Sequence, residues 1–366
     1  MQKPVFRISI VAVFFLVLFL SIFWKSAEAQ IIFREDKPMV TPLWHRLADY
    51  SPTLRSVESA EISPDGRYVI SASKFGYHLM LWRTADGHLI WEKVLDAEIE
   101  AVTFSPDGEF IVAGDEAYNV TVYDLEGTLV RELDHDAAFD GITWSPDGKY
   151  IAGGSEGGEV VLWNTDTWEK ERILTAGNTV NSLEFTKDVT KLIAAGNRYD
   201  KSTNSGERHG FVKAWDISNN RNVLIDLKAQ KRSTKSVRLS PDETRFAIAG
   251  FANQVKVYSF PAAEELAVID VPERLEAIAY HPEGNFIFVG GHGEEMRVYH
   301  TGTYTQVHTF PCRRVEYIHF SQDGRLMATG HEDSGLLTLH LLHSKVQSSE
   351  DYDQLSREIL ENKDLD

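Results

Sequence analysis

Seven residues recur along the chain at one position, five residues before the first residue of a short turn motif. They are Glu58, Glu100, Asp140, Asn181, Lys235, Glu276 and Glu316. If the fold gathers the five carboxylates, their mutual repulsion raises their pKa values unless a cation neutralises them. A lysine- or arginine-bearing peptide, a basic protein or a divalent cation would each supply that charge. Acids that only solvate an exposed rim would need no such ligand.

A complementary group of basic residues lies in two nearby stretches. One is the run from Lys228 to Lys235, and the other is the polar stretch from Asn197 to Gly210. We expect both on the face that carries the carboxylates, where charge of opposite sign would orient a docking partner more than strengthen its binding. Solvated loops are the plain alternative. The basic residues proposed to contact a partner are Arg198, Lys201, Lys231, Arg232 and Lys235.

Catalytic and metal-binding patterns are weak by comparison. His78, His209, His292 and His331 share no repeat position, and no His-x-His or Glu-x-x-His spacing accompanies them. P-loop and Rossmann glycine patterns are absent from the sequence. Cys312 is the only cysteine, which excludes an intramolecular disulfide and a cysteine zinc site. We therefore expect no catalytic residue, no metal site and no cofactor.

The turn motif that sets this spacing is Ser-Pro-Asp-Gly. Proline presets φ at the first corner of the turn, and glycine accepts the positive φ at its end. Clear copies begin at Ser63, Ser105 and Ser145, variants begin at residues 240, 281 and 321, and a worn copy begins at Thr186. The steps between first residues are 42, 40, 41, 54, 41 and 40. A period near 40 with short strands on both sides of each turn is typical of a β-propeller.

A second anchor follows each turn, and it carries a resemblance to a known family. It is Trp82, Tyr123, Trp163, Trp215, Tyr258 and Tyr299, with His340 in the seventh place. Leu-Trp-Arg at 81–83, Leu-Trp-Asn at 162–164 and Ala-Trp-Asp at 214–216 resemble the Trp-Asp end of a WD40 repeat. The repeats are degenerate, because none has a clean Gly-His opener and the Asp-His-Ser-Trp network of the family cannot be assembled. The resemblance implies an all-β, seven-bladed propeller over residues 42–344.

The resemblance also implies how the ring closes and which face binds. The last repeat ends after its third strand, and the orphan strand that begins near Pro42 is expected to complete it, as in other WD40 propellers. Partner peptides commonly dock in such relatives on the face where the seven recurring residues would lie. The long 54-residue step belongs to the fourth repeat, and its extra residues, 197–210, are expected to form a surface loop.

The two ends of the chain differ from the repeats. Lys3 and Arg7 precede an apolar run at residues 8–24, and small residues lead to Ala29. This pattern predicts a signal peptide over residues 1–29, with a membrane anchor at 8–24 as the alternative. Both would export the propeller to the periplasm or the cell exterior. Residues 30–41 are expected to be a linker, and 345–366 an acidic tail, either disordered or transiently helical.

The net charge of −18 argues against nucleic acid as a partner, because the field of so acidic a body repels phosphate. We therefore expect a monomeric, non-enzymatic interaction platform that binds a protein or peptide with a basic element. Contact with a membrane would be made only through the N-terminal segment. One alternative is an exported propeller enzyme of the lactonase, lyase or dehydrogenase kind, with its site at the channel mouth. Another is an architectural subunit gripped by its outer strands.

Overall fold

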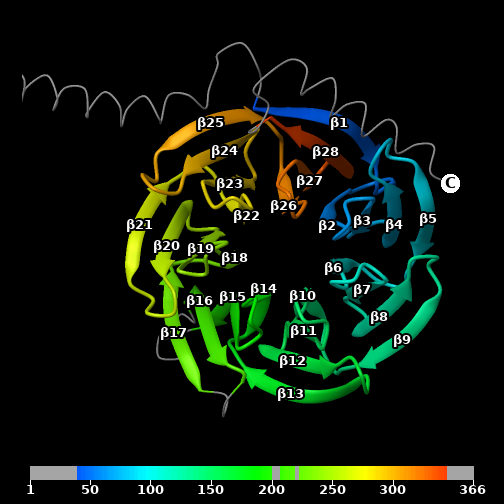
Figure 1. Cartoon of the computed structure of the whole chain (residues 1–366), viewed down its shortest axis with the longest axis horizontal. Helices are drawn as coiled ribbons and strands as arrows, with labels where there is room; N and C mark the ends of the chain where they lie inside the picture. The colour runs from blue at the N-terminus through cyan, green and yellow to red at the C-terminus, as the bar shows by residue number, and fades with distance from the viewer. Residues whose placement is uncertain (1–38, 200–206, 219–221, 344–366) are drawn as a thin grey trace, which may run out of the picture.

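A computed structural model of the chain describes residues 39–199, 207–218 and 222–343. These residues form seven four-stranded antiparallel sheets arranged as blades around one axis (Figure 1). The all-β, seven-bladed propeller predicted from the turn spacing is thereby confirmed. The predicted signal or anchor segment, most of the predicted linker, Lys201 and the predicted acidic tail lie outside the described residues. Within the described ranges, no helix is long and apolar enough to cross a membrane.

Each blade runs outward from the axis through strands A, B, C and D. Blade 1 comprises β2 Val57–Ile62, β3 Tyr68–Ser73, β4 His78–Arg83 and β5 Leu89–Val94, and blade 2 comprises β6 Ile99–Phe104, β7 Phe110–Asp115, β8 Asn119–Asp124 and β9 Leu129–Asp134. Blade 3 comprises β10 Phe139–Trp144, β11 Tyr150–Ser155, β12 Glu159–Asn164 and β13 Glu169–Thr175. Blade 4 comprises β14 Thr179–Phe185, β15 Lys191–Tyr199, β16 Arg208–Asp216 and β17 Val223–Gln230. Blades 5 and 6 comprise β18 Thr234–Leu239, β19 Arg245–Gly250, β20 Gln254–Ser259 and β21 Glu265–Asp270; β22 Leu275–Tyr280, β23 Phe286–Gly291, β24 Glu295–His300 and β25 Gln306–Pro311.

Blade 7 closes the ring with strands from both ends of the propeller. It comprises β26 Val315–Phe320, β27 Leu326–His331, β28 Leu336–Leu342 and, as its outermost strand, β1 Val40–Leu47. β1 pairs with β28 from Val40↔Leu342 to Leu47↔Leu336, so the predicted closure by an N-terminal strand is confirmed. The indole of Trp44 donates to Thr84 O at 2.8 Å, and this bond also joins β1 to blade 1.

The turn between strands A and B is held by its own side chains. In blade 1, Ser63 Oγ donates to Asp65 at 2.7 Å and accepts from the backbone N–H of Tyr68 at 2.9 Å. Gly66 ends the turn at φ 75°. The worn copy in blade 4 keeps the hydroxyl–carboxylate bond, from Thr186 to Asp188 at 2.6 Å, and holds Val189 at φ 54° without glycine. The acid and hydroxyl therefore hold this turn in blade 4 without the proline or the glycine.

The core consists of seven apolar clusters, one at each junction between neighbouring blades. Between blades 1 and 2, for example, Ile70 and Leu81 pack against Val102 and Phe104. Strands B and C are almost wholly buried, whereas the outer D strands alternate, as the burial of β5 shows. The ring is therefore stabilised by burial of apolar surface between blades, which fixes the position of every A strand at the axis.

The tryptophan anchors are only partly hydrogen-bonded. In blade 1 the Trp82 indole donates to Ser71 Oγ at 2.9 Å, but the Trp163 indole in blade 3 has no hydrogen-bond partner among the described residues. Gly153 stands where blade 1 has Ser71, and a Cβ there would lie 2.6 Å from the Phe139 ring. An aromatic side chain thus occupies the space that the serine of a WD40 network would need.

The hairpin of blade 4 is longer than the others. β15 and β16 have nine residues each and remain paired as far as Tyr199↔Arg208. The surface loop expected from Asn197 to Gly210 is therefore replaced by strand at both ends, and residues 200–206 lie outside the described part of the chain.

Candidate functional site

The seven recurring residues all occupy the same kind of backbone irregularity. In every blade the pairing of strands A and B skips one residue near the start of strand A, as between Val57 and Ser59 or between Phe139 and Gly141. The skipped residue is the recurring one in all seven blades. A β-bulge leaves that residue outside the ladder and redirects its side chain. The fold therefore turns a sequence repeat into a ring of side chains at the axis.

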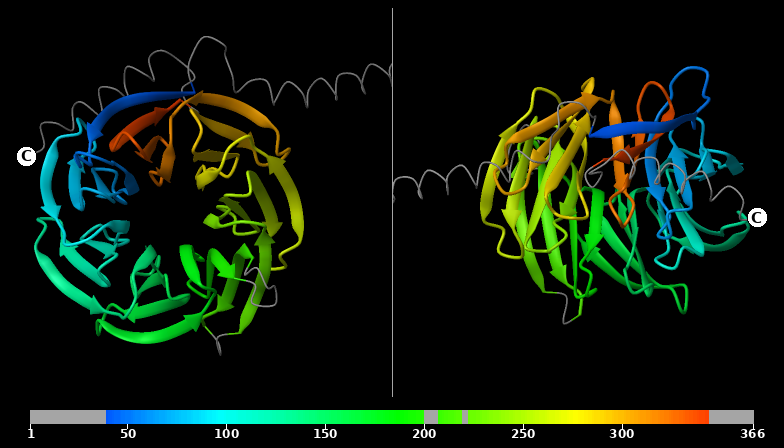
Figure 2. Two further views of the ribbon diagram at one scale, coloured as in Figure 1. Left: turned by 180° about the vertical axis from the view of Figure 1, so that it is seen from behind. Right: turned by 45° about the horizontal axis from the view of Figure 1, so that its top comes forward.

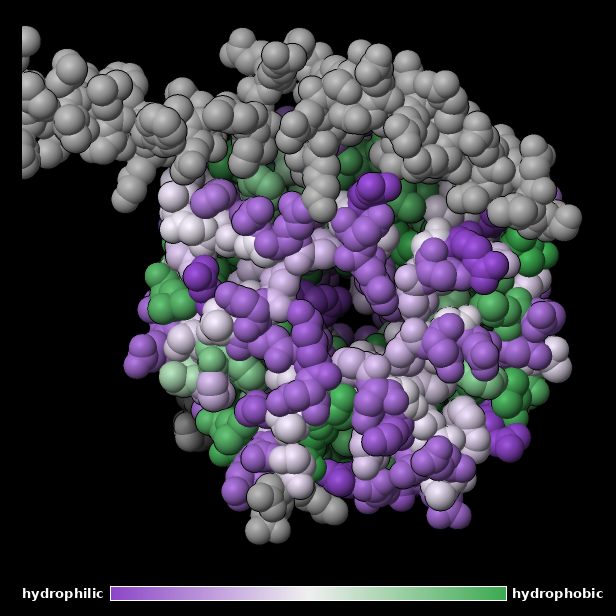
Figure 3. Space-filling model, in the orientation of Figure 1, coloured by the Kyte–Doolittle hydropathy of each residue, from purple (hydrophilic) through white to green (hydrophobic). Residues whose placement is uncertain are grey.

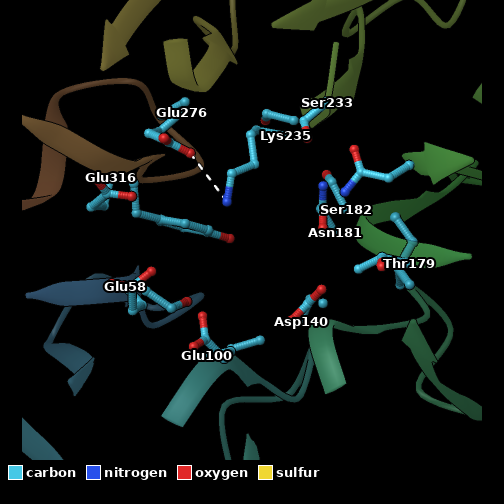
Figure 4. Close-up of a pocket in the computed structure, with 18 of the residues that line it drawn as sticks. Glu58, Glu100, Asp140, Thr179, Asn181, Ser182, Ser233, Lys235, Glu276 and Glu316 are labelled. Carbon is cyan, nitrogen blue, oxygen red and sulfur yellow. Dashed lines mark ion pairs between the residues drawn. The ribbon is translucent and has the colours of Figure 1, made fainter. Parts of the chain in front are cut away.

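These side chains surround a hollow of about 340 Å³ at one mouth of the central channel (Figure 4). All seven line it, as do residues at the ends of the B strands. Figure 3 shows one end of the central channel at the axis of the wheel, with hydrophilic side chains around it. The side chain of Asn181 is already hydrogen-bonded, because its amide donates to Thr234 O of blade 5 at 2.7 Å. The other six are ionisable: five carboxyl groups and the ammonium of Lys235.

Two lysines of the chain face the carboxylates. Lys235 Nζ lies 3.4 Å from Glu276, and Lys74 Nζ lies 2.5 Å from Glu100 and 3.5 Å from Glu98. Figure 4 shows Lys235 extending into the hollow toward the acids on the opposite blades. Lys235 thus lies inside the acidic arc, where it partly neutralises it.

The charged forms of these carboxyl groups remain destabilised despite the two lysines. Burial, followed by repulsion from Glu100, raises the pKa of Glu58 to about 7 and that of Asp140 to about 7. Burial and repulsion from Glu276 and Glu58 raise the pKa of Glu316 well above its usual value. Burial alone would lower the pKa of Lys235, but the surrounding carboxylates raise it, so the ammonium stays charged. The mouth therefore holds protons at neutral pH that a new cation would displace.

A second ring surrounds the first and was missed in the sequence. It is formed by the residue that follows each turn's first residue by eleven: Lys74, Glu116, Glu156, Asn197, Phe251, His292 and Glu332. The first five line the same hollow. His292 Nε2 lies 2.8 Å from Glu276. The fixed spacing could have revealed this ring, but its residue types are too mixed to draw attention.

Three groups in the described part of the chain bring possible metal ligands within 4.8 Å of one another. They are Glu276, His292 and Glu316; Glu98, Glu100 and Glu116; and Glu116, Asp140 and Glu156. All draw on the two rings. Lys235 and Lys74 already pair with members of the first two groups.

The channel is narrowed below the acidic mouth. Arg238 and Tyr317 line both this hollow and the one at the opposite end, and their side chains meet at 3.4 Å. Beyond them, Glu61 accepts the N–H of Phe104 at 3.1 Å and Glu184 accepts that of Leu239 at 2.9 Å. These carboxylates join neighbouring blades, so acids at the far end serve the fold.

The structure places the predicted basic residues in different parts of the surface. Arg198 pairs with Asp226 at 2.8 Å and donates to Ala176 O at 2.6 Å, toward blade 3. Lys231 and Arg232 are exposed beside blade 5 and line a separate groove. Lys235 belongs to the mouth, and Lys201 is outside the described residues. Arg208, which was not among the predicted contacts, lines the mouth from blade 4.

Two family models match parts of the chain. The model described as "WD domain, G-beta repeat" matches residues 127–164, from the end of blade 2 through the C strand of blade 3. The model described as "Eukaryotic translation initiation factor eIF2A" matches residues 182–333, which run through blades 4 to 7.

Similar proteins share the chain at low identity. Telomerase protein component 1 of Rattus norvegicus is 24% identical over 179 residues, which are 48% of this chain and 6% of that protein. Eukaryotic translation initiation factor 3 subunit I of Nematostella vectensis is 23% identical over 154 residues, 37% of this chain and 47% of that protein. Serine-threonine kinase receptor-associated protein of Gallus gallus is 22% identical over 206 residues, 48% of this chain and 59% of that protein. The matched part of the chain thus spans less than two thirds of each relative.

Proposed function

Because this chain is a seven-bladed β-propeller of the WD40-repeat family, we propose that it is a non-enzymatic platform that docks a protein or peptide partner at the acidic mouth. WD40 propellers act generally as protein-interaction scaffolds, and the low-identity relatives are compatible with that general role. The finer proposal is that the partner carries a basic element. Its contacts would be Glu58, Glu100, Asp140, Glu276 and Glu316.

The observation that carries the proposal is the excess of carboxylate in the hollow. Seven carboxylates and four cations line it. Of these carboxylates, only Glu100 and Glu276 have an ion pair within the described ranges: Glu100 with Lys74, and Glu276 with Lys235 and His292. Neighbouring carboxylates repel the charged forms of Glu58, Asp140 and Glu316, and a partner cation would relieve that repulsion.

Lys235 supports the choice of a lysine or arginine side chain as the docking element. Its ammonium reaches from blade 5 into the arc and lies 3.4 Å from Glu276. A side chain from a partner would enter along the axis and meet the arc of blades 7, 1, 2 and 3. The narrowing at Arg238 and Tyr317 would stop it from passing through.

Fluorescence anisotropy of a labelled peptide of alternating lysine and arginine would test this. The variant Glu58→Gln with Glu316→Gln is expected to weaken binding by at least about tenfold, since each lost charge contact with a buried acid is worth about 1 kcal/mol or more. A matched control is Glu126→Gln with Glu169→Gln, which removes two exposed carboxylates away from the mouth. That control should bind as the wild type does.

Equal weakening in both variants would mean that the peptide responds only to overall negative charge. Unchanged binding in the mouth variant would place the docking surface elsewhere. Either result contradicts the proposal.

We also propose that the propeller is exported, with residues 1–29 as the signal peptide or residues 8–24 as an anchor. The support is the sequence alone, a basic start followed by an apolar run and small residues at Ala27 and Ala29. Determining the N-terminus of the chain recovered from its own cells, together with protease accessibility in intact cells, would test it. A chain that begins at Met1 and is protected from protease would contradict export.

A further inference from the structure

A second hollow on the propeller, here called the blade 5 groove, has the opposite charge to the mouth. It has a volume of about 890 Å³ and is lined by eleven residues of blades 4 to 6. Five of these are cations and none is an acid: Lys228, Lys231, Arg232, Lys256 and Arg274. The chain as a whole has 55 acids and 37 lysines and arginines. A groove without any carboxylate is therefore a local reversal of the protein's charge.

The cations most exposed in the groove have no ion pair in the described chain. Lys231, Arg232 and Arg274 have exposed side chains, and none of them has an ion pair within the described parts of the chain. Lys256 is paired with Glu265 at 3.0 Å. Some other exposed arginines of the described chain sit beside an acid, as Arg67 does with Asp65 and Arg325 with Asp323. The groove therefore concentrates positive charge that the fold itself does not use.

Phe251 separates the groove from the mouth. It lines both hollows, and its ring lies between Lys235 Nζ at 5.4 Å and the Arg274 guanidinium at 5.3 Å. Cations over an aromatic ring are held by its quadrupole. The ring therefore keeps one cation turned to the acids of the mouth and another at the edge of the groove.

The groove also offers a group suited to a peptide backbone. Gln230 is 6% exposed, and its Nε2 donates to Ser233 O at 2.7 Å and to Thr234 Oγ1 at 3.2 Å. These bonds orient the amide, and they leave Gln230 Oε1 as a buried acceptor without a donor in the described chain. Buried acceptors normally have a partner. A backbone N–H is the donor that an extended peptide would bring.

We infer that the blade 5 groove binds an acidic, carboxylate-rich segment of the same partner whose basic element docks at the mouth. The inference rests on the proposed function, and it adds a direction to it: the partner would run from basic to acidic as it crosses Phe251. A nucleic acid fits less well, because its backbone would lie against the seven carboxylates of the adjoining mouth. Opposite charges on two neighbouring subsites fix orientation and exclude partners of uniform charge.

Three labelled peptides would test this against the full-length protein: a lysine–arginine hexapeptide, a glutamate hexapeptide, and the two joined by a short glycine–serine linker. The joined peptide should bind at least about tenfold more tightly than the basic peptide alone, because the second contact becomes intramolecular. Lys231→Gln with Arg232→Gln should remove that gain and leave binding of the basic peptide unchanged. Lys170→Gln with Arg313→Gln removes the same two charges elsewhere and should keep the gain.

The two proposals fail separately in this experiment. If the basic peptide binds but the glutamate peptide does not, and joining them gives no gain, the groove inference is overturned and the proposed function stands. If only the glutamate peptide binds and the groove variant abolishes it, the groove remains and the mouth proposal fails. A duplex DNA oligonucleotide that binds more tightly than the glutamate peptide, with the same sensitivity to the groove variant, would also overturn the inference.

Discussion

The cost of ionising Asp140 gives a direct measure of the field in the mouth. Its pKa is raised from 3.8 to about 7, first by burial and then by repulsion from Glu100. A carboxyl whose pKa is higher in the folded than in the unfolded chain binds its proton more tightly when folded. Stability is therefore lost as pH rises through this window, and the loss is complete above pH 7.

We expect Asp140→Asn to stabilise the propeller, because asparagine keeps the shape of the side chain and removes the charge. At 1.36 kcal/mol for each pKa unit, the free energy of unfolding should rise by about 4 kcal/mol at pH 8 and by about 2 kcal/mol at pH 5. Asp166 is the matched control, since it is an exposed aspartate of the same blade, between β12 and β13. Asp166→Asn should change stability by less than about 0.5 kcal/mol at either pH.

Urea unfolding followed by tryptophan fluorescence at both pH values would measure these differences. An unchanged m-value would show that the variants alter stability and not the extent of unfolding. Adding a saturating basic peptide should reduce the advantage of Asp140→Asn at pH 8, because the peptide neutralises the wild-type arc. Equal stabilisation at pH 5 and pH 8, or no stabilisation at all, would refute the view that the ring of carboxylates is electrostatically strained.

Three further predictions concern the same architecture. Lys235→Met should lower the free energy of unfolding by about 3 kcal/mol at pH 8 and by less at pH 5, because it leaves Glu276 and Glu316 without their ammonium; urea unfolding at the two pH values measures this. Binding of a basic peptide should release protons, because the peptide lowers the raised pKa values of Glu58 and Asp140. The affinity for the peptide should therefore rise from pH 5.5 to pH 8, and calorimetry in buffers of different ionisation enthalpy should detect the released protons. An affinity that does not change with pH would contradict this prediction. Gly148→Ala should cost about 1 kcal/mol in thermal unfolding, since Gly148 has φ 78° and a Cβ there would touch nothing within 4 Å, while Gly157→Ala, at ordinary φ, should cost less.

The sequence was sufficient to predict the fold and the composition of the inner ring. The Ser-Pro-Asp-Gly turn fixes where strand A ends, so counting back from it locates one residue in each blade. The bulge that directs these residues to the axis was not predictable, because it arises from pairing between two strands and leaves no mark on either one alone. The orphan strand near Pro42 was assigned correctly because the last repeat lacked a fourth strand.

Side-chain partners were harder to predict than backbone positions. Arg198 and Lys231 are both basic residues near blade 4, but Asp226 on β17 lies across β16 from β15 and takes the Arg198 guanidinium. That choice depends on the register of three strands. Lys235 was assigned to the basic group, yet its long side chain reaches the arc of acids. The groove beside blade 5 required Arg274 from blade 6, which is distant in sequence from Lys231.

The closure of the ring by β1 and β28 has a geometric consequence for attachment. Val40 and Leu342 are paired in blade 7, so the described chain enters and leaves the wheel within one sector of its circumference (Figures 1 and 2). β1 is the outermost strand of that blade and the strand farthest from the propeller axis. A tether through the segment before Val40 would therefore attach at the outer rim of the propeller. The mouth of the central channel would stay accessible to a partner.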